Sequence, residues 1–477
     1  MNPQVSWKDY EGVEGFGQAT QNDVDDLNKA LTAGQEQNPP GSVVAGDGFA
    51  LRVESLDSTL RNTTYKMKHV QLWRDVFKAP AYNTVEEYSQ MHSYGDNPDA
   101  GFIDEGDLPN DSDSEYERKF SVVKYIGTTR KVSHVMSLIK PAHGAVIGRE
   151  TVNGTMHLLR ILERSLFKGN STLSALQFDG FEKLILDNSP AANIIDLRGE
   201  PLSEDVLIDA ALTVSDAPNY GTPTDLYLNP KCHADLVKTF FPKERTRPGM
   251  LEGGLVGLDI NGWTSPAGNV NFKPDVFITD GGAPTAALGD AAKAPAIPTV
   301  GSVTTPADGA SQFAADDAGD YYYVAQAVNR YGRSGSVDVP SGPTAVTVAP
   351  GDKVTFTLTP STAVAVGWYE IFRTKKDGAA GTARLILRVP NGAGAGAQTI
   401  NDFNASLPYC TSGYLFQQNS ENMAFRQLAP MVKIPLATID SSIRWMQLIY
   451  GVPQLFTPGK NVLFTNVGRA KGFVGQP

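Results

Sequence analysis

Apolar residues recur at helical spacing most clearly between Val146 and Lys168. Gly169 follows directly, and glycine is common just after the last turn of a helix. The pattern therefore predicts a helix over 146–168, about 35 Å long. One face of it would carry Val152, Met156, Leu159, Leu162 and Leu166, widened by Leu158 and Ile161.

The charged side chains of this helix mark its polar side. Arg160, Glu163 and Arg164 fall outside the apolar stripe. Taken singly, each of these charges is expected to be solvated. Together they are also candidates for ion pairs with neighbouring molecules.

Before this helix, two strand-like segments flank a long acidic loop. Residues 102–117 hold seven acids and no base. We expect a projecting hairpin whose loop is solvated, with Asp104, Glu105 and Asp107 available for contacts. The loop does not fit an EF-hand calcium site, because Tyr116 stands where that motif needs glycine.

The N-terminal part shows less regular patterning. Residues 1–50 are rich in Gly, Asn, Gln and Pro and predict a mostly extended arm. The following segment, 51–65, favours a helix, because Val53, Leu56 and Leu60 share one face.

Helices and strands alternate after residue 190, which indicates a mixed α/β domain. Ser203 precedes two acids and is expected to cap a helix. A polar, basic run at 242–254, which contains Arg245 and Arg247, predicts a surface loop. The expected elements, in order, are the helix SEDVLIDAALTVSD, the strand TDLYLNP, the helix KCHADLVKTFF and the strand VNFKPDVFITD.

A change of character marks an inserted domain. Residues 281–298 form an Ala, Gly and Pro linker, and residues 291–408 hold short strand patterns separated by turn residues. This pattern predicts a β-sandwich. Its strand DYYYVAQAVN could bury either Tyr323, Ala325 and Ala327 or the alternate set Tyr322, Val324 and Val328.

The C-terminal part returns to strands that cannot form a stable domain alone. We expect them to pair with strands from before residue 285, which makes the sandwich an insertion in an exposed loop of its host.

Charge and cysteine content exclude several classes of function. The formal net charge is -11 and the sequence pI is about 5.1, which argues against a protein that grips nucleic-acid phosphates. The cysteines, Cys232 and Cys410, lie far apart and suggest spare thiols rather than a disulfide framework. The sequence shows neither a signal peptide nor a membrane-spanning run of apolar residues.

Known catalytic motifs are also missing from the sequence. It has no GxSxG, HExxH or P-loop motif, and its six histidines never stand four residues apart. We therefore expect no enzyme activity, no metal and no cofactor.

Several colinear segments carry a resemblance to a known family. They are GFALRVESLDSTLRNTTY, APAYNTVEEYSQMHSYG, YERKFSVVKYIGTTRKVSH, PAHGAVIGRETVNGTMHLLRILERSLFKGN and IDLRGEPLSEDVL. Together they resemble the major capsid proteins of tailed double-stranded DNA bacteriophages, over about residues 45–285 and 409–468, near 300 of the 477 residues. Region 291–408 resembles immunoglobulin-like or fibronectin type III-like domains, although its A-V-N strand precedes the WYEIFR strand, the reverse of the usual fibronectin order.

The resemblance implies an α+β, Hong Kong 97-type fold. Its parts would be an N-terminal arm at 1–50, an extended loop and peripheral domain at 51–190 with a spine helix at 146–168, an axial domain at 191–285 and 409–455, the inserted sandwich at 291–408, and C-terminal strands of the peripheral domain at 456–477.

The implied function is that of a structural protein which self-assembles into pentamers and hexamers of an icosahedral head. The expected partners are copies of itself, portal and scaffolding proteins, and packaged double-stranded DNA that lies nearby without sequence-specific binding. No membrane is expected. The protein would be located in the virion after assembly in the bacterial cytoplasm, with its sandwich on the outer surface. Assembly contacts are expected at Asp104, Glu105, Asp107, Arg160, Glu163, Arg164, Arg245 and Arg247.

Two alternatives remain at this point. The chain could be an adhesin or carbohydrate-binding protein in which the sandwich is the functional unit, or an enzyme with an accessory β-module. The first predicts a secretion signal and the second a compact catalytic constellation, and the sequence shows neither.

Overall fold

The computed structural model describes residues 64–95, 102–108, 111, 113–139, 145–244, 262–279, 281–361, 364–437 and 440–470, with the backbone alone at 241–244. The expected arm (1–50), almost all of the helix expected at 51–65, and the loop with Arg245 and Arg247 lie outside these ranges. The described residues within Thr64–Leu138 and Val146–Pro477 belong to one compact unit.

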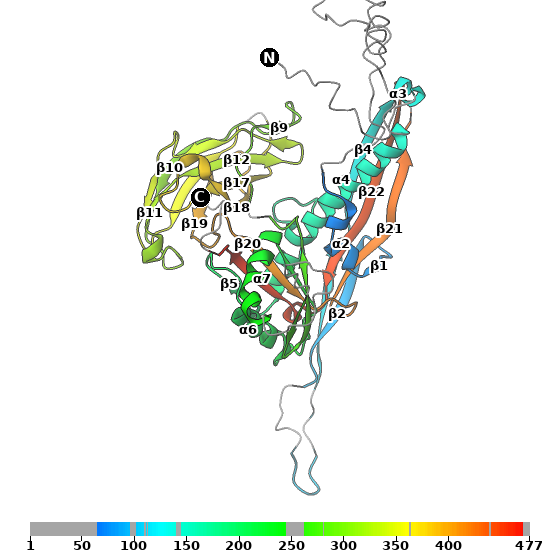
Figure 1. Cartoon of the computed structure of the whole chain (residues 1–477), viewed down its shortest axis with the longest axis vertical. Coiled ribbons are helices and arrows are strands. Elements are labelled where there is room, and N and C mark those ends of the chain that lie inside the picture. Colours follow the sequence, from blue (N-terminus) through cyan, green and yellow to red (C-terminus); the bar gives the residue numbers. More distant parts are fainter. Residues whose placement is uncertain are drawn as a thin grey trace, which may run out of the picture. The chain divides into compact units, whose positions relative to one another are not determined.

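A long sheet with the strand order β1-β21-β22-β4 carries the longest helix (Figure 1). β1 runs parallel to β21, and the other pairs are antiparallel. Helix α4 packs against β4 and β22 and has the bounds expected from the sequence. The bounds are β1 Lys78–Pro80, β4 Lys124–Ser133, β21 Met423–Pro435, β22 Ser442–Leu455 and α4 Val146–Lys168, with shorter helices η3 Met67–His69, α2 Leu72–Asp75 and α3 His134–Leu138.

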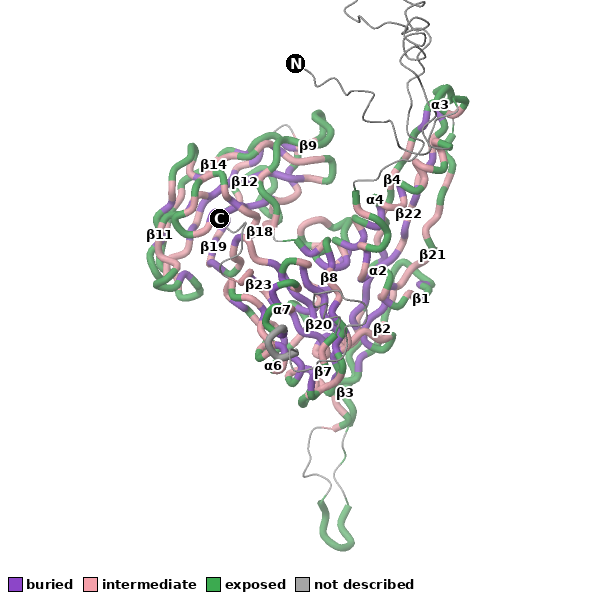
Figure 2. Tube along the Cα trace, viewed as in Figure 1, coloured by how far each residue is buried: buried purple, intermediate pink, exposed green. Residues whose placement is uncertain are grey.

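The buried face of α4 is partly the one expected. Leu159, Leu162 and Leu166 are buried in one core, whereas Val152 is 61% exposed. In the first half of the helix small residues face the sheet instead. There β22 lies close to the helix backbone, and Gln447 of β22 donates a 2.9 Å hydrogen bond to the Thr151 carbonyl. A Cβ at Gly154 would overlap the same Gln447 side chain. Figure 2 shows the buried residues gathered along α4, β22 and β20.

The expected hairpin is present. β2 (Val85–Ser93) and β3 (Glu115–Val122) pair antiparallel and extend away from the long sheet (Figure 1). Part of the loop between them, residues 102–108, is described and exposed.

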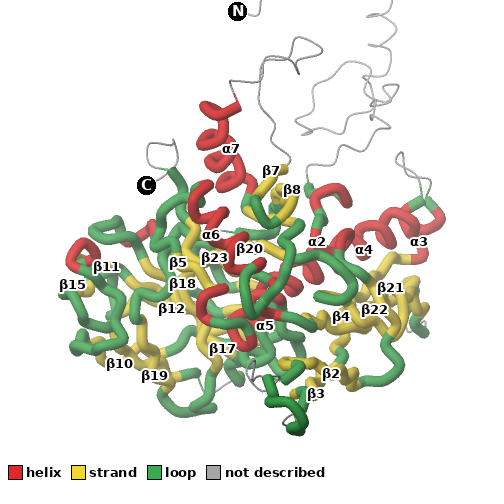
Figure 3. Tube along the Cα trace, turned by 90° about the horizontal axis from the view of Figure 1, so that it is seen from below, coloured by secondary structure: helices red, strands yellow, loops and turns green. Residues whose placement is uncertain are grey.

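An α/β sheet has the order β5-β23-β20-β6-β8-β7. Ser203 caps α6 as expected, since its hydroxyl accepts a 3.4 Å hydrogen bond from the Val206 amide. Helices α6 and α7 pack on this sheet through one apolar core (Figure 3). The bounds are β5 Ile194–Asp196, β6 Asp225–Leu228, β7 Gly262–Ser265, β8 Gly268–Pro274, β20 Thr411–Phe416, β23 Val462–Val467, α5 Phe181–Asn188, α6 Glu204–Ser215 and α7 Pro230–Glu244, with the short turns η5 Ala191–Asn193 and η8 Pro458–Lys460.

Strand pairing divides the C-terminal part differently from the expected 409–455 and 456–477. β20 joins the α/β sheet, but β21 and β22 leave it and pair with β1 and β4 of the long sheet. β23 then returns to the α/β sheet between β20 and β5. The reason is that β22 matches the full length of β4, from Ser442 opposite Ser133 to Gly451 opposite Lys124.

The inserted region consists of β-sheets that share a core. A three-stranded sheet, β10-β16-β19, and a larger one, β18-β17-β12-β13-β9 with β14 also on β12, bury one apolar cluster between them. An all-β sandwich is therefore present, and its immunoglobulin-like class stays a prediction. The bounds are β9 Leu288–Gly289, β10 Thr299–Thr304, β11 Gly319–Tyr321, β12 Tyr323–Asn329, β13 Gly332–Arg333, β14 Val337–Val339, β15 Val346–Val348, β16 Val354–Thr359, β17 Trp368–Arg373, β18 Arg384–Pro390 and β19 Gln398–Asp402, with the short turns η6 Ala315–Asp317 and η7 Ala380–Thr382.

The central strand β12 is covered on both faces. Tyr323, Ala325 and Ala327 face the core of the sandwich, while Val324 packs with Phe372 in a separate small cluster. The sequence left open which set is buried, and the structure buries residues of both.

Candidate assembly surfaces

The hairpin has one face toward the protein and one exposed face. On the inner face, the Tyr88 ring lies edge-on against Phe456 at 5.0 Å, and its hydroxyl donates a 3.2 Å hydrogen bond to the Leu455 carbonyl. Residues opposite one another in the register share a face, and successive residues of a strand point to opposite faces, so the outer face holds the residues next to Tyr88 and every second residue from them. It carries the exposed residues Val85, Glu87, Met91, Tyr116, Arg118, Phe120 and Val122.

The described tip of the loop is a tight turn. The Asp107 amide donates a 3.1 Å hydrogen bond to the Asp104 carbonyl, and Gly106 has a φ of 88°. That positive φ favours glycine at the third position of a type II turn. Asp104, Glu105 and Asp107 are exposed as expected, between Phe102 and Leu108, which are each 86% exposed.

The three charged residues expected on the polar side of α4 have different environments. Arg160 is exposed, with its guanidinium 5.8 Å from the Tyr65 ring centre. Arg164 is exposed as well. Glu163, however, is fully buried at 0% exposure, so its expected place on a solvated face is wrong.

Glu163 holds the start of helix α2. One carboxylate oxygen accepts hydrogen bonds from the Gln71 and Leu72 amides at 2.9 and 2.6 Å, and the other accepts one from the Trp73 amide at 2.8 Å. Backbone amides at a helix start lack partners within the helix, and a carboxylate satisfies them. Glu163 therefore joins α4 to the start of α2 inside the subunit.

A second buried carboxyl, Asp275, lies beside Glu163. Its Oδ1 accepts a 2.7 Å hydrogen bond from the Phe277 amide. Burial, followed by a hydrogen bond with Asp275 and its charge, raises the pKa of Glu163 to about 9. Burial also raises the pKa of Asp275. At neutral pH the pair therefore holds a shared proton.

A cluster of arginines lies where α4 meets the sandwich. Glu370 of β17 accepts contacts from Arg333 and Arg388 at 3.4 and 3.1 Å. Arg164 keeps an exposed surface, yet loss of hydration and then the like charges of Arg388 and Arg160 lower the pKa of its guanidinium. The cluster is thus richer in positive than in negative groups.

A groove of about 500 Å³ adjoins this cluster. Arg330 and Arg333 contribute charge to its wall, and Leu176, Leu288, Tyr331 and Trp368 contribute apolar surface. The Arg330 side chain lies over the Tyr331 ring, with 4.5 Å from the guanidinium carbon to the ring centre.

Arg198 joins the sandwich to the α/β sheet. Its guanidinium donates hydrogen bonds to the carbonyls of Asn404 and Gln312 at 2.7 and 2.9 Å and pairs with Asp317 at 3.2 Å. Because all three partners belong to the sandwich or its exit, this side chain helps to hold the joint, together with Asn466, which bonds to Ala405 and Leu407.

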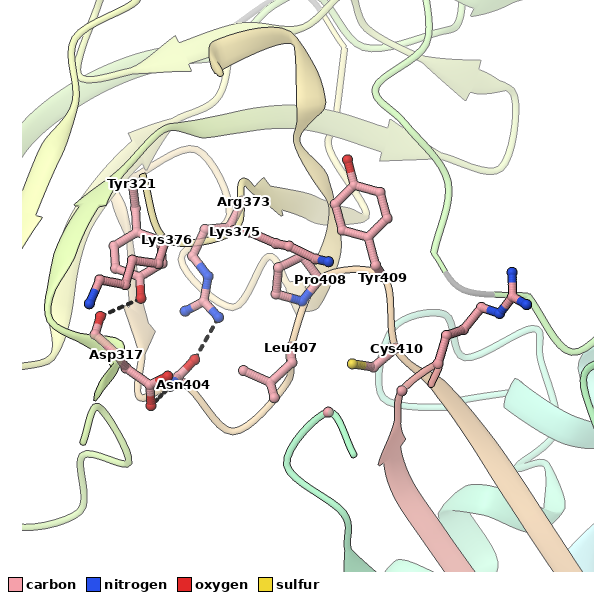
Figure 4. Close-up of a pocket in the computed structure, with 13 residues that line it drawn as sticks. Asp317, Tyr321, Arg373, Lys375, Lys376, Asn404, Leu407, Pro408, Tyr409 and Cys410 are labelled. Carbon is pink, nitrogen blue, oxygen red and sulfur yellow. Dashed lines mark hydrogen bonds between the residues drawn. The ribbon is translucent and has the colours of Figure 1, made fainter. Parts of the chain in front are cut away.

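A small pocket of about 170 Å³ lies at the same joint (Figure 4). Arg373, one of its lining residues, is buried and bonds to Asp402 and Asn404 at 2.6 Å each. Burial raises the pKa of the Cys410 thiol to about 12, so the thiol stays protonated and is a weak nucleophile. The pocket is built as a structural joint.

In the described part of the chain, no group of three or more His, Cys, Asp and Glu side chains could hold a metal ion. No described helix is long and apolar enough to cross a membrane.

Comparison with known proteins decides the class of this chain. No protein-family model matches it. The major capsid proteins of Staphylococcus phages S25-3 and K are each 27% identical to it over 459 residues, covering 93% of this chain and 95% of theirs. The chain is similar to phage major capsid proteins over nearly its whole length. Among solved structures, the capsid of a native GTA particle gives 10% identity and a TM-score of 0.43 over 91% of this chain and all of the other, and the capsid of Myoviridae phage XM1 gives 9% and 0.42 over 89% and 99%.

This capsid protein is a structural component of the phage capsid and is located in the virion. Its described part has a long helix on a long sheet, an extended hairpin and an α/β sheet, the elements that the Hong Kong 97-type resemblance implied. The relatives are capsid proteins, so the adhesin alternative is wrong.

The sequence did not reveal several of the residues that the structure brings together. Glu163 had a signal, because it stands four residues from both Leu159 and Phe167 and so shares their buried face. Arg198 had none, since its partners are more than a hundred residues away. The arginine cluster had none either, since Arg164 is more than a hundred residues from Arg333, Glu370 and Arg388.

Proposed function

We propose that this capsid protein builds pentamers and hexamers of the head shell, and that the β2–β3 hairpin is its principal arm for contact with a neighbouring copy. The observation that carries the proposal is the exposed apolar outer face of the hairpin. Contiguous apolar surface is rare on monomeric proteins and marks an interaction site.

The sheets suggest a division of labour within the subunit. We assign the α/β sheet, formed by 191–285 with 409–416 and 462–467, to the axial domain at the centre of each capsomer. The long sheet with α4, which includes 423–455, would form the peripheral domain. The sandwich at 291–408, of immunoglobulin-like class, would lie on the outer surface.

Partners and chemistry follow from the same proposal. Portal and scaffolding proteins would contact the shell during assembly, and double-stranded DNA would lie against its lining. A net charge of -11 suits a container, because a lining that bound phosphates tightly would hinder release of the DNA. We propose no enzymatic activity.

Reversing the charge of the tip tests the role of the hairpin. A variant with Asp104→Lys, Glu105→Lys and Asp107→Lys keeps its fold, because these side chains are exposed and Gly106 is retained. We expect at least tenfold fewer particles by negative-stain microscopy and sedimentation, with circular dichroism unchanged. Glu421→Lys, an exposed reversal outside the hairpin, serves as the control. Shells of normal yield from the tip variant would contradict the proposal.

A further inference from the structure

One face of the larger sandwich sheet carries arginine side chains around a single glutamate. In the register, Val328 lies opposite both Arg333 and Trp368, and Gln326 lies opposite Glu370, which in turn lies opposite Arg388. Opposed residues share a face and so do residues two apart, so Trp368, Glu370, Arg333 and Arg388 point to the same side. Ala325 and Ala327, which alternate with them, face the sandwich core.

The charges on this face are not balanced. The Glu370 carboxylate already forms ion pairs with both Arg333 and Arg388. Arg164 and Arg160 of α4 add two guanidinium groups to the same neighbourhood, and Arg330 adds a third on the groove wall. A cluster of like charges is costly unless an anion joins it.

The groove also has an apolar part. Trp368 lines its wall, and Leu288 and Leu176 beside it are 69% and 61% exposed. The partner should therefore combine carboxylates with apolar side chains.

The tip of the hairpin has this composition. Within residues 102–108, three exposed carboxylates are flanked by three exposed apolar side chains, Phe102 and Ile103 on one side and Leu108 on the other. The polar contacts of the described tip are internal to its turn, between Asp104 and Asp107 and between Asp107 and Leu108.

We propose that the groove beside Trp368, with its arginine cluster, receives the acidic hairpin tip of a second copy of this chain. This rests on the proposed role of the hairpin as an assembly arm and names the surface that receives it. Carboxylates of the tip would pair with Arg330 and Arg164, and Phe102 and Leu108 would cover Leu288 and Leu176. The inserted sandwich then takes part in joining subunits.

DNA is the less favoured partner for this groove. A phosphate backbone would satisfy the arginines but not the exposed leucines, whereas the tip supplies both charge and apolar surface.

A charge-swap experiment tests the inference. The groove variant carries Arg164→Glu and Arg330→Glu, both exposed positions, and the tip variant carries the three lysines described above. Each variant alone should give at least tenfold fewer particles by sedimentation and microscopy. The variant that combines all five changes restores opposite charges and should recover at least half of the wild-type yield. Arg74→Glu, at a side chain 59% exposed and outside the groove, should assemble normally.

The outcomes separate the two proposals. If the tip variant fails and the groove variant assembles normally, the hairpin keeps its role and the groove inference is wrong. The inference is also overturned if the variant with all five substitutions assembles no better than the tip variant or the groove variant alone. The same holds if the groove variant forms normal shells that retain less DNA. Normal assembly of the tip variant would instead remove the role of the hairpin itself.

Discussion

Glu163 and Asp275 show how single residues set the stability of this subunit. Each side chain is buried, and together they bring two carboxyl groups into a site that tolerates one negative charge. The Glu163 carboxyl accepts hydrogen bonds from three backbone amides, whereas Asp275 Oδ2 is buried and has no hydrogen-bond partner in the described part of the chain. A proton between the two groups is therefore part of the folded state.

The stability of the subunit should depend on pH through this proton. The pKa of Glu163 is raised in the folded state. The proton therefore contributes fully to the free energy of unfolding at pH below the unfolded pKa near 4.5, and this contribution is lost as pH rises toward about 9. The free energy of unfolding should fall by up to about 1.4 kcal/mol per pH unit across that window. Chemical unfolding of unassembled subunits at several pH values measures it.

Asp275→Asn is the matched variant. The amide can donate to Glu163 without a second charge, which removes two of the causes that raise the pKa of Glu163. We expect a shallower pH dependence and a gain in stability at pH 8–9. Identical pH profiles for the two proteins would contradict the shared-proton account.

Among the elements, α4 was predictable to the residue and the sheets were not. An apolar period and a following glycine are local signals, so Val146–Lys168 could be found from the sequence. Pairing is not local: β22 joins β4 across some three hundred residues, and β23 joins the other sheet only six residues after β22 ends. The sequence shows that a segment is a strand but not which strand it pairs with.

The outer face of the hairpin should matter for assembly but not for folding. Phe120→Asp places a charge in the exposed apolar face opposite Glu87, where it has no core contacts to lose. We expect the melting temperature of the subunit to change by less than about 2 °C and the particle yield to fall at least tenfold. Ile297→Asp, a similarly exposed apolar residue outside the hairpin, is the control. Equal particle yields from both variants would argue against this face as a contact surface.

The joint at Arg198 should couple the sandwich to its host. Arg198→Ala removes hydrogen bonds to Gln312 and Asn404 and the ion pair with Asp317, at a cost of about 1–3 kcal/mol. Amide hydrogen exchange should rise at residues 403–410, where the chain leaves the sandwich. Lys353→Ala, which removes an ion pair with Asp308 inside the sandwich, should leave those residues unchanged. If amide hydrogen exchange at residues 403–410 is the same in both variants, Arg198 does not hold the joint.

At the scale of the whole molecule, the chain is a shell subunit with a sandwich set into it. The insertion could be predicted from the linker at 281–298 and the short strand patterns after it, because the composition changes abruptly there. The tip acids could be proposed from a run of charge in one stretch of sequence. The groove that we propose for them could not, since it forms only when the segment after α4 and strands β9, β12, β13 and β17 come together. Residues that build a surface from several elements leave no local pattern.

The central claim is that this chain assembles with copies of itself. Sedimentation velocity of the purified protein, with negative-stain microscopy of the fastest fraction, tests it most directly. We expect capsomers and closed shells many times heavier than the 51.2 kDa chain. A single species at the mass of the monomer, over the range of concentration and salt in which the subunit stays folded, would contradict the account.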